Sequence, residues 1–192
     1  MTDRTDRKGL PLPDQPLQTE RLSLQLVSEC SLPGLFEVHA SEDVCRYLPF
    51  ATWVDMEDAR TWYARARQRH MDGDAIQWAV TLRATGTVLG MCLLFNYEPS
   101  HGRAELGYSL GQSYWGQGFA REAVSVVIAH GFDALGLHRL EARVDPRNSA
   151  SAGLLRRLGF VHEGCLRRRD HLKDERVDVD YFGLLQPDWD RA

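Results

Sequence analysis

The amino-acid sequence predicts an α/β (α+β) fold, in which a mixed, mostly antiparallel twisted sheet carries helices on both faces. Three observations support this class: short segments in which apolar and polar residues alternate, longer segments with apolar residues at helical spacing, and a glycine-containing turn that joins a strand to a helix. Alternation with a period of two is typical of half-buried strands, and helical spacing is typical of amphipathic helices. The two patterns interleave without an internal repeat, so we expect the 192 residues to form one domain.

The beginning of the chain differs from the rest. Residues 1–16 are polar, contain Pro11, Pro13 and Pro16, and lack apolar periodicity, so we expect a flexible leader followed by a single domain over residues 17–192. Residues 1–9 lack the apolar core of a signal peptide, and no run of about 18 apolar residues follows that could span a bilayer. These features favour a cytoplasmic protein.

In the first half of the chain, a strand is followed by two helices and a hairpin. Leu22, Leu24 and Leu26 alternate with polar residues and predict the strand. Gly86 lies between residues 75–83 and 88–97, which we expect to form an antiparallel pair, and it can supply the positive φ angle that a hairpin turn needs. The expected elements are strand Arg21–Val27, helices over about residues 31–40 and 55–73, and strands Ala75–Arg83 and Val88–Tyr97.

The second half alternates strands and helices and ends in two strands. Apolar residues from Phe119 onward have helical spacing, and Gly159 can end the following helix. The block Arg167–His171 is short and interleaved with acidic residues, so we expect a solvated loop there. The expected elements are strand Arg103–Leu110, helix Gly118–Gly136, strand His138–Val144, helix Asn148–Leu158, and strands Phe160–Leu166 and Val177–Leu185.

Charge, cysteines and histidines exclude several classes of function. The formal net charge is -4 and the pI is about 6.0, whereas nucleic-acid and anionic-membrane surfaces need a clustered basic excess. The four cysteines form no C-x-x-C pair and the seven histidines form no H-x-x-x-H pair, so we expect neither a disulfide framework nor a metal site. A small neutral or cationic partner fits this composition.

The turn at residues 115–120 is a candidate phosphate-binding site. Gly116 and Gly118 line a turn that leads into a helix, and the N-terminus of a helix offers unpaired N–H groups and partial positive charge to a pyrophosphate. Glycines at this spacing also occur in ordinary tight turns, and that alternative stays open. No Gly-Lys-Ser/Thr sequence follows and the third glycine of G-x-G-x-x-G is missing, which disfavours the mononucleotide and dinucleotide folds.

Three motifs in a fixed order include this turn. They are RAELGYSL at residues 103–110, WGQGFA at residues 115–120, and a helix that begins with NSAS at residue 148 and ends in LRRLGF at residue 160. Together they resemble the GNAT N-acetyltransferases, specifically the RimJ/RimL type, over roughly residues 17–188. The resemblance implies a sheet that opens into a V between Leu110 and His138, acetyl-CoA as co-substrate, and a primary amine as acceptor, either a protein N-terminal α-amine or a small molecule. It also suggests a homodimer.

The resemblance implies a set of cofactor-binding residues. The backbone of Tyr108, Ser109 and Leu110 would pair with the pantetheine arm, and the Leu110 N–H would polarise the thioester carbonyl, although these residues could also form a simple core strand. The family's pyrophosphate loop falls on Trp115, Gly116, Gln117, Gly118, Phe119 and Ala120. Trp115 stands where the family has Gln or Arg, but backbone amides make the phosphate contacts, so the departure does little damage.

The candidate acid and base are Ser151 and Glu105. Many GNAT enzymes use a tyrosine to protonate the departing thiolate, but Leu155 occupies its position here, and the resemblance implies Ser151 instead, with Asn148 contacting the cofactor arm. Asn148 could also act only as an N-cap, and Ser151 could support only the first helical turn. Glu105 lies on the strand that leads to the thioester, so it could deprotonate the amine, or it could be a structural carboxylate paired with Arg103 or Arg143.

Within the resemblance, the Arg167–His171 block and the two early helices border the acceptor cleft. Its wall could include Trp53, Trp62, Tyr63 and Trp78, although each could instead pack in the core. We expect direct attack of the amine, because Cys92 and Cys165 lack the paired base of a nucleophile. The missing tyrosine keeps open a second function, a catalytically silent acyl-CoA-binding or sensor module. A nucleotide-binding regulator is a further alternative.

Overall fold

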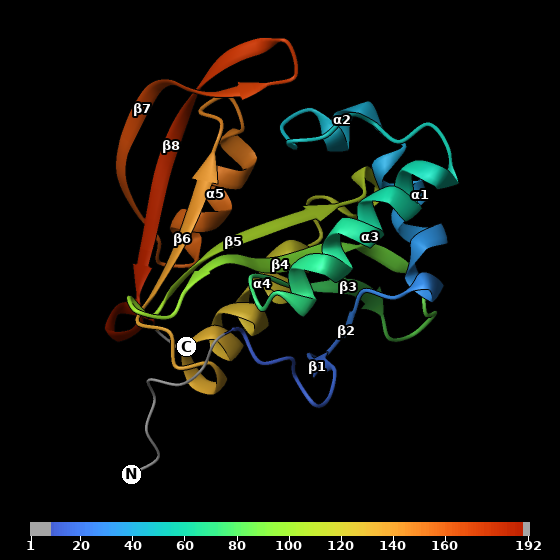
Figure 1. Cartoon of the computed structure of the whole chain (residues 1–192), viewed down its shortest axis with the longest axis horizontal. Coiled ribbons are helices and arrows are strands. Elements are labelled where there is room, and N and C mark those ends of the chain that lie inside the picture. Colours follow the sequence, from blue (N-terminus) through green and yellow to red (C-terminus); the bar gives the residue numbers. More distant parts are fainter. Residues whose placement is uncertain (1–8, 190–192) are drawn as a thin grey trace.

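The computed structural model describes residues 9–189, and these form one sheet with helices on both faces (Figure 1). The strand order is β1-β2-β3-β4-β5-β6-β8-β7, and all neighbours are antiparallel except β5 and β6, which are parallel. The predicted fold class is confirmed. The strands are β1 Leu17–Gln18, β2 Leu22–Leu26, β3 Ile76–Leu82, β4 Val88–Glu98, β5 Arg103–Leu110, β6 Arg139–Val144, β7 Val161–Leu172 and β8 Glu175–Leu185. The helices are α1 Leu32–His39, α2 Glu42–Cys45, α3 Met56–Met71, α4 Phe119–Ala129 and α5 Ser149–Arg157.

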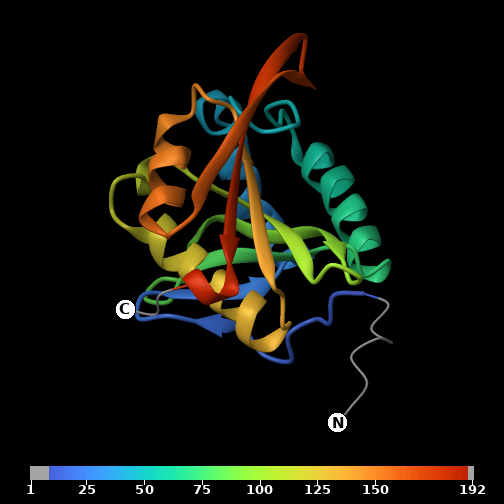
Figure 2. The same ribbon diagram turned by 90° about the vertical axis from the view of Figure 1, so that its left-hand side faces the viewer.

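Two separate apolar clusters attach the helices to the two faces of the sheet (Figure 2). On β3, Trp78 belongs to the cluster that contains residues of α4 and α5, whereas its neighbour Ala79 belongs to the cluster that contains residues of α1 and α3. Successive side chains of a strand point to opposite faces, so α4 and α5 cover one face and α1 and α3 cover the other.

The sheet opens between β5 and β6, as the resemblance implied. The two strands pair only over Arg103–Glu105 and Arg139–Glu141, and beyond these residues they diverge (Figure 1). Within the described chain, the part of β5 from Leu106 to Leu110 is therefore paired with β4 alone. One edge of its backbone is free at the opening of this V, which is where an added strand-like ligand could pair.

The predicted loop at Arg167–His171 is wrong, because β7 continues through it to Leu172 and pairs with β8 in a long hairpin. The register shifts between Leu166 and Asp170, and Arg168 has a φ of 50° at this bulge. An edge strand that is exposed on most of its length needs no alternation of apolar residues, and charged residues are usual on such edges. The sequence pattern therefore contained no strand signal there.

The ends of other elements also differ from the prediction. Helix α4 ends at Ala129 and continues as a π-helical turn over His130–Ala134 instead of running to Gly136. The short elements β1 and α2 were not predicted, because two and four residues are too few to show periodicity. Of the predicted flexible leader, residues 1–8 lie outside the described residues, but Leu10 is buried in the core and its N–H donates to the Gly73 carbonyl. Within the described residues, the part of the predicted leader around Leu10 is therefore packed against the domain.

Other expectations concern spans, metals and thiols. Over residues 9–189, no helix has the length and apolar character needed to cross a membrane. In the same part of the chain, no group of three or more His, Cys, Asp or Glu residues is placed to hold a metal ion. All four cysteines are free thiols, with Cys45 and Cys92 buried and Cys30 and Cys165 exposed.

Candidate active site

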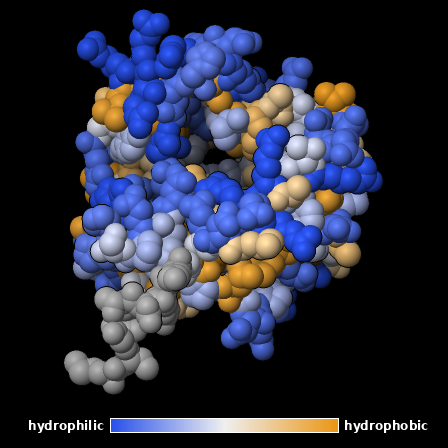
Figure 3. All heavy atoms as spheres, in the orientation of Figure 1, coloured by the Kyte–Doolittle hydropathy of each residue, from blue (hydrophilic) through white to orange (hydrophobic). Residues whose placement is uncertain are grey.

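A cavity of about 1300 Å³ occupies the opening of the V. It is visible as a hollow in the space-filling view (Figure 3). Strand β5, the turn before α4, the start of α5, the α2 region and the β7–β8 hairpin all contribute to its wall. Two contacts bridge its rim, from the Lys173 ammonium to the Cys45 carbonyl at 3.0 Å and from the Tyr47 hydroxyl to the Arg147 carbonyl at 3.3 Å. This volume can hold a nucleotide-sized ligand together with a second substrate.

The predicted turn reaches the cavity and has the conformation that only glycine adopts easily. Gly116 and Gly118 have φ angles of 72° and 81°, and Gly118 is the N-cap residue of α4. Both line the cavity, with Trp115 and Ala120. An added Cβ at Gly116 would meet nothing within 4 Å, so the space beside the backbone is open. The turn thus presents unpaired N–H groups at a helix N-terminus, the arrangement that binds phosphate.

Arg21 fixes this turn from the outside. Its guanidinium donates to the Gln117 carbonyl at 3.2 Å and to the Glu122 carboxylate at 2.7 Å, and it stacks over the Phe119 ring at 4.3 Å. The carbonyl of Gln117 and the N–H of Gly118 belong to one trans peptide group and point in opposite directions. Since the carbonyl faces Arg21, the Gly118 N–H is directed away from Arg21 and toward the cavity.

The free end of β5 also directs backbone groups into the V. Gly111 N–H donates to the Leu89 carbonyl of the neighbouring chain segment at 2.8 Å. Hydrogen-bonded and non-hydrogen-bonded pairs alternate along antiparallel strands, so Ser109 bonds to β4 whereas the N–H groups of Tyr108 and Leu110 point away from it. Trp115, the residue that departs from the family pattern, donates its indole N–H to the Leu110 carbonyl at 2.7 Å and so ties the turn to the end of β5.

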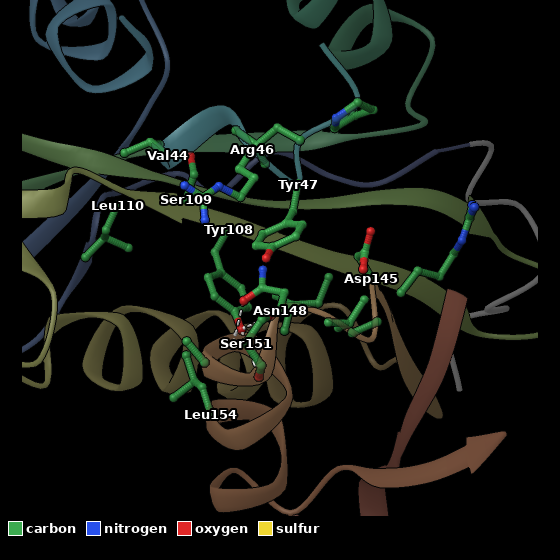
Figure 4. A pocket seen from close by; sticks show the side chains of 18 of the residues that line it. Val44, Arg46, Tyr47, Tyr108, Ser109, Leu110, Asp145, Asn148, Ser151 and Leu154 are labelled. Carbon is green, nitrogen blue, oxygen red and sulfur yellow. Dashed lines mark hydrogen bonds between the residues drawn. The ribbon is translucent and has the colours of Figure 1, made fainter. Parts of the chain in front are cut away.

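A pair of hydroxyl groups lies beside this backbone edge (Figure 4). The hydroxyls of Tyr108 and Ser151 are 2.7 Å apart. Burial raises the pKa of Tyr108 to about 12, so the phenol remains protonated. Asn148 caps α5 by accepting a hydrogen bond from the Ser151 N–H at 3.1 Å, which leaves its side-chain NH₂ group to donate to a ligand. The sequence indicated Tyr108 only as a backbone contact and missed its hydroxyl as the partner of Ser151.

Glu105 lines the cavity but is not paired with either predicted arginine. Its carboxylate accepts a hydrogen bond from the Asn96 side chain at 2.8 Å. Arg103 instead binds Glu98 and Glu141, and Arg143 binds Asp170. The suggested ion pairs of Glu105 are therefore wrong, and its carboxylate lies at the wall of the cavity with Asn96 as its partner.

The four candidate aromatic residues separate into cavity and core positions. Trp62 lines the cavity, and Trp53 lies buried behind it with the two ring centroids 5.5 Å apart. Tyr63 packs against the same apolar cluster. Trp78 is fully buried on the other face of the sheet, so it cannot line the cleft. Four further aromatic residues that the sequence did not single out also line the cavity: Tyr47, Phe50, Phe95 and Tyr114.

A buried histidine lies behind the cavity wall and was missed by the sequence analysis. His39 of α1 has no exposed surface, and its two ring nitrogens lie 2.9 Å from the Leu35 carbonyl and 2.9 Å from the Ser109 hydroxyl. A carbonyl can only accept, so Nδ1 carries the proton and Nε2 accepts from Ser109. Burial lowers the pKa of His39 to about 4. The signal available in the sequence was a histidine one turn after Leu35, on the apolar face of a predicted helix.

The burial of neutral His39 predicts a pH dependence of stability. The unfolded chain takes up a proton near pH 6.5 but the folded chain only near pH 4, so the free energy of unfolding should be constant above the first value and fall between the two, by about 3 kcal/mol in total. Denaturant titrations from pH 4 to 8 measure this slope. His70 and His130 also have pKa values lowered by burial and act in the same direction. The test therefore compares how the free energy of unfolding changes with pH in the wild type and in His39→Gln. Equal slopes in the two proteins would contradict the prediction.

The fold and the cavity together define the class of protein. A sheet splayed beside a helix N-terminus, with free N–H groups along the splayed strand and hydroxyls at its end, is suited to hold an acyl-CoA and to transfer its acyl group. The comparison with known proteins agrees. Residues 21–161 match the family described as acetyltransferase (GNAT) domain. The chain therefore belongs to the GNAT family and is an acetyl-CoA-dependent N-acetyltransferase.

Individual relatives support the RimJ/RimL-type resemblance. The chain is 35% identical over 173 residues to the uncharacterized N-acetyltransferase p20 of Bacillus licheniformis, covering 90% of this chain and 97% of the relative. It is 27% identical over 187 residues to the [ribosomal protein uS5]-alanine N-acetyltransferase of Escherichia coli, covering 93% and 94%. The crystal structure of a GNAT-family acetyltransferase from Bacillus anthracis shares the fold, with a TM-score of 0.80, 23% identity, and coverage of 90% of this chain and 99% of that one.

Proposed function

We propose that this enzyme transfers the acetyl group of acetyl-CoA to a primary amine by direct attack in a ternary complex. The observation that carries the proposal is the position of the Leu110 N–H, which points into the V next to the hydroxyl pair of Tyr108 and Ser151. A fixed N–H donor stabilises the negative charge that develops on a thioester oxygen during attack. A hydroxyl beside it can protonate the leaving thiolate.

The cofactor is held by the free backbone edge and the turn. Backbone groups of Tyr108 and Leu110 pair with the pantetheine arm, on either side of Ser109, and the Asn148 side chain donates to the same arm. The N–H groups at the beginning of α4 bind the pyrophosphate. The residues of this turn are Trp115, Gly116, Gln117, Gly118, Phe119 and Ala120.

The chemical steps combine attack on the thioester with proton transfers at the sulfur and at the amine. The neutral amine attacks the carbonyl carbon, the Leu110 N–H stabilises the oxyanion, and the C–S bond breaks as the C–N bond is completed. Ser151 gives its proton to the sulfur and receives the Tyr108 proton through their 2.7 Å hydrogen bond, and Tyr108 regains a proton from solvent before the next cycle. Glu105 accepts the proton that the amine loses, directly or through water. No cysteine takes part, because burial raises the pKa of Cys92 to about 12 and the pKa of Cys165 is also raised, so both remain thiols.

The acceptor is a protein N-terminal α-amine or a small-molecule amine. An α-amine has a pKa of about 8 and is partly neutral at pH 7, whereas a lysine side chain has a pKa of about 10.4 and is almost entirely protonated. The catalytic base therefore has to deprotonate a smaller fraction of an α-amine substrate. The Escherichia coli relative is named for an alanine of ribosomal protein uS5. The cavity wall contains the aromatic residues Trp62 and Phe95 as well as Glu105, which suits an amine that carries an apolar group. A single domain, a homodimer and a cytoplasmic location remain predictions.

Release of free thiol from acetyl-CoA in the presence of different amines tests the proposed function. The panel consists of peptides with free N-terminal serine or alanine, spermidine and kanamycin. We expect amine-dependent thiol release and a mass increase of one acetyl group on the acceptor. Saturable acetyl-CoA binding without turnover of any amine would instead identify a silent binding module. A thermal shift with acetyl-CoA but none with ATP or NAD excludes a nucleotide-binding regulator.

Glu105→Gln tests the assignment of the base. The amide cannot take up the amine proton, so kcat/KM should fall by a factor of about 10² to 10⁴ near pH 7. The loss should become smaller at high pH, where more of the amine is already neutral. A pH–rate profile from pH 6 to 10 measures this, with Glu98→Gln as the matched control, because Glu98 lies on β4 and is absent from the cavity wall. A loss that is constant with pH would assign Glu105 a structural role.

A further inference from the structure

Ser109 lies next to Leu110, whose N–H marks the proposed position of the thioester. Its side chain is on the side opposite to the hydroxyls of Tyr108 and Ser151. It precedes Leu110 directly, lines the cavity, and is only 7% exposed. Tyr108 points toward α5, as its contact with Ser151 shows (Figure 4), whereas Ser109 points toward α1, as its bond to His39 shows. Alternation along β5 thus places one hydroxyl on each side of the thioester position.

The hydrogen bonds of Ser109 determine what it can offer to a ligand. Its backbone groups bond to Met91 of β4, and its hydroxyl proton is donated to Nε2 of His39. His39 cannot reverse this bond, because its Nδ1 proton is held by the Leu35 carbonyl. A serine oxygen has one proton and two lone pairs, so toward the cavity Ser109 can act only as an acceptor. The low pKa of His39, about 4, keeps the ring neutral and preserves this arrangement at physiological pH.

We propose that Ser109, oriented by His39, accepts a hydrogen bond from an N–H of the incoming amine and so directs the nitrogen lone pair at the thioester carbon. This inference rests on the proposed function. The amine then approaches the thioester carbon from the side of α1, and the thiolate leaves on the other side, toward Ser151. Ser109 accepts a hydrogen bond but no proton, and the proton released by the amine goes to Glu105 or water. Ser109 is thus a catalytic residue and His39 a positioning residue.

Ser109→Ala separates a contact with the amine from a contact with the cofactor. With the best amine of the panel, we expect the KM for the amine to rise about tenfold, the effect of one lost hydrogen bond, while the dissociation constant of acetyl-CoA stays unchanged in isothermal titration. Ser125→Ala is the control, since Ser125 is a half-buried serine of α4 on the other face of the sheet. An unchanged amine KM overturns the proposal, and so does an equal rise in the acetyl-CoA dissociation constant, which would make Ser109 a cofactor contact.

Two substitutions of His39 test its positioning role. His39→Gln retains an oxygen that can accept the Ser109 proton and should keep the amine KM near that of the wild type. His39→Phe fills the same space without an acceptor and should raise the amine KM as Ser109→Ala does, with no further rise in the double variant. Equal KM values for the two His39 variants would reduce His39 to a packing role and overturn its part of the proposal. If His39→Phe does not fold, the amine KM of Ser109→Ala still tests whether Ser109 contacts the amine. Absence of turnover of every amine by the wild-type enzyme would refute the proposed function instead.

Discussion

Gly118→Val should abolish tight binding of acetyl-CoA. At a φ of 81°, a β-branched residue is strained. Its Cβ would also lie 3.4 Å from the Arg21 guanidinium that holds the turn, so the backbone N–H groups would lose the orientation that they offer to the pyrophosphate. Loss of one or two hydrogen bonds to a charged group, each worth about 1.5–3 kcal/mol, corresponds to a rise in the dissociation constant of roughly a hundredfold. Isothermal titration with acetyl-CoA measures this directly.

The matched control for this variant is Gly86→Val. Gly86 has a φ of 75° and lies in the turn between β3 and β4, where an added Cβ meets nothing within 4 Å. It therefore suffers the same backbone strain at a distance from the cofactor, and it should lower the melting temperature without changing acetyl-CoA affinity. If Gly118→Val and Gly86→Val bind acetyl-CoA equally well, the turn before α4 is an ordinary tight turn and the assignment of the pyrophosphate site is wrong.

Ser151→Ala should reduce turnover without weakening cofactor binding. The substitution removes only the hydroxyl that protonates the thiolate, so kcat should fall by a factor of about 10² to 10⁴ while the acetyl-CoA dissociation constant is unchanged. Tyr108→Phe should lower kcat less, because Ser151 can then recover its proton from water. Thiol-release kinetics at saturating amine measure both effects.

Ser149→Ala provides the control for Ser151→Ala. Ser149 begins the same helix and also lines the cavity, but none of the proposed steps uses its hydroxyl. Full activity of Ser151→Ala would mean that the proton reaches sulfur from water or from Tyr108, and the assignment of Ser151 would be withdrawn while the acetyltransferase activity stood. Because the cofactor site and the acid depend on different residues, the Gly118 and Ser151 variants should lose different kinetic parameters.

The local parts of the fold were predictable from the sequence. Alternation identified β2, and the glycine-containing turn at Gly86 separated β3 from β4. The turn with Gly116 and Gly118 was recognised because glycine, strand end and helix start are neighbours in the chain. The opening of the V came from the family resemblance. These features depend on short-range patterns or on motifs, and both are visible in one sequence.

The remaining parts depend on contacts between distant residues. The partner of His39 is 70 residues away and the partner of Tyr108 is 43 residues away, so no spacing rule indicates either pair. Leu10 was assigned to the leader because a single apolar residue has no periodicity, although its burial against the core fixes it. The ion pairs suggested for Glu105 failed for the same reason, since Arg103 binds Glu141, 38 residues away, and Arg143 binds Asp170, 27 residues away.

The bonds that Arg21 makes to the turn before α4 have a consequence for the thermodynamics of cofactor binding. Because the guanidinium holds the Gln117 carbonyl and the Glu122 carboxylate, the conformation of the turn is set while the protein folds. The entropy of ordering these residues is then lost in folding, and a ligand that arrives later binds a preorganised surface. Affinity for the pyrophosphate is thereby linked to Arg21, a residue directly before β2 that does not line the cavity and that stands at the beginning of the family match.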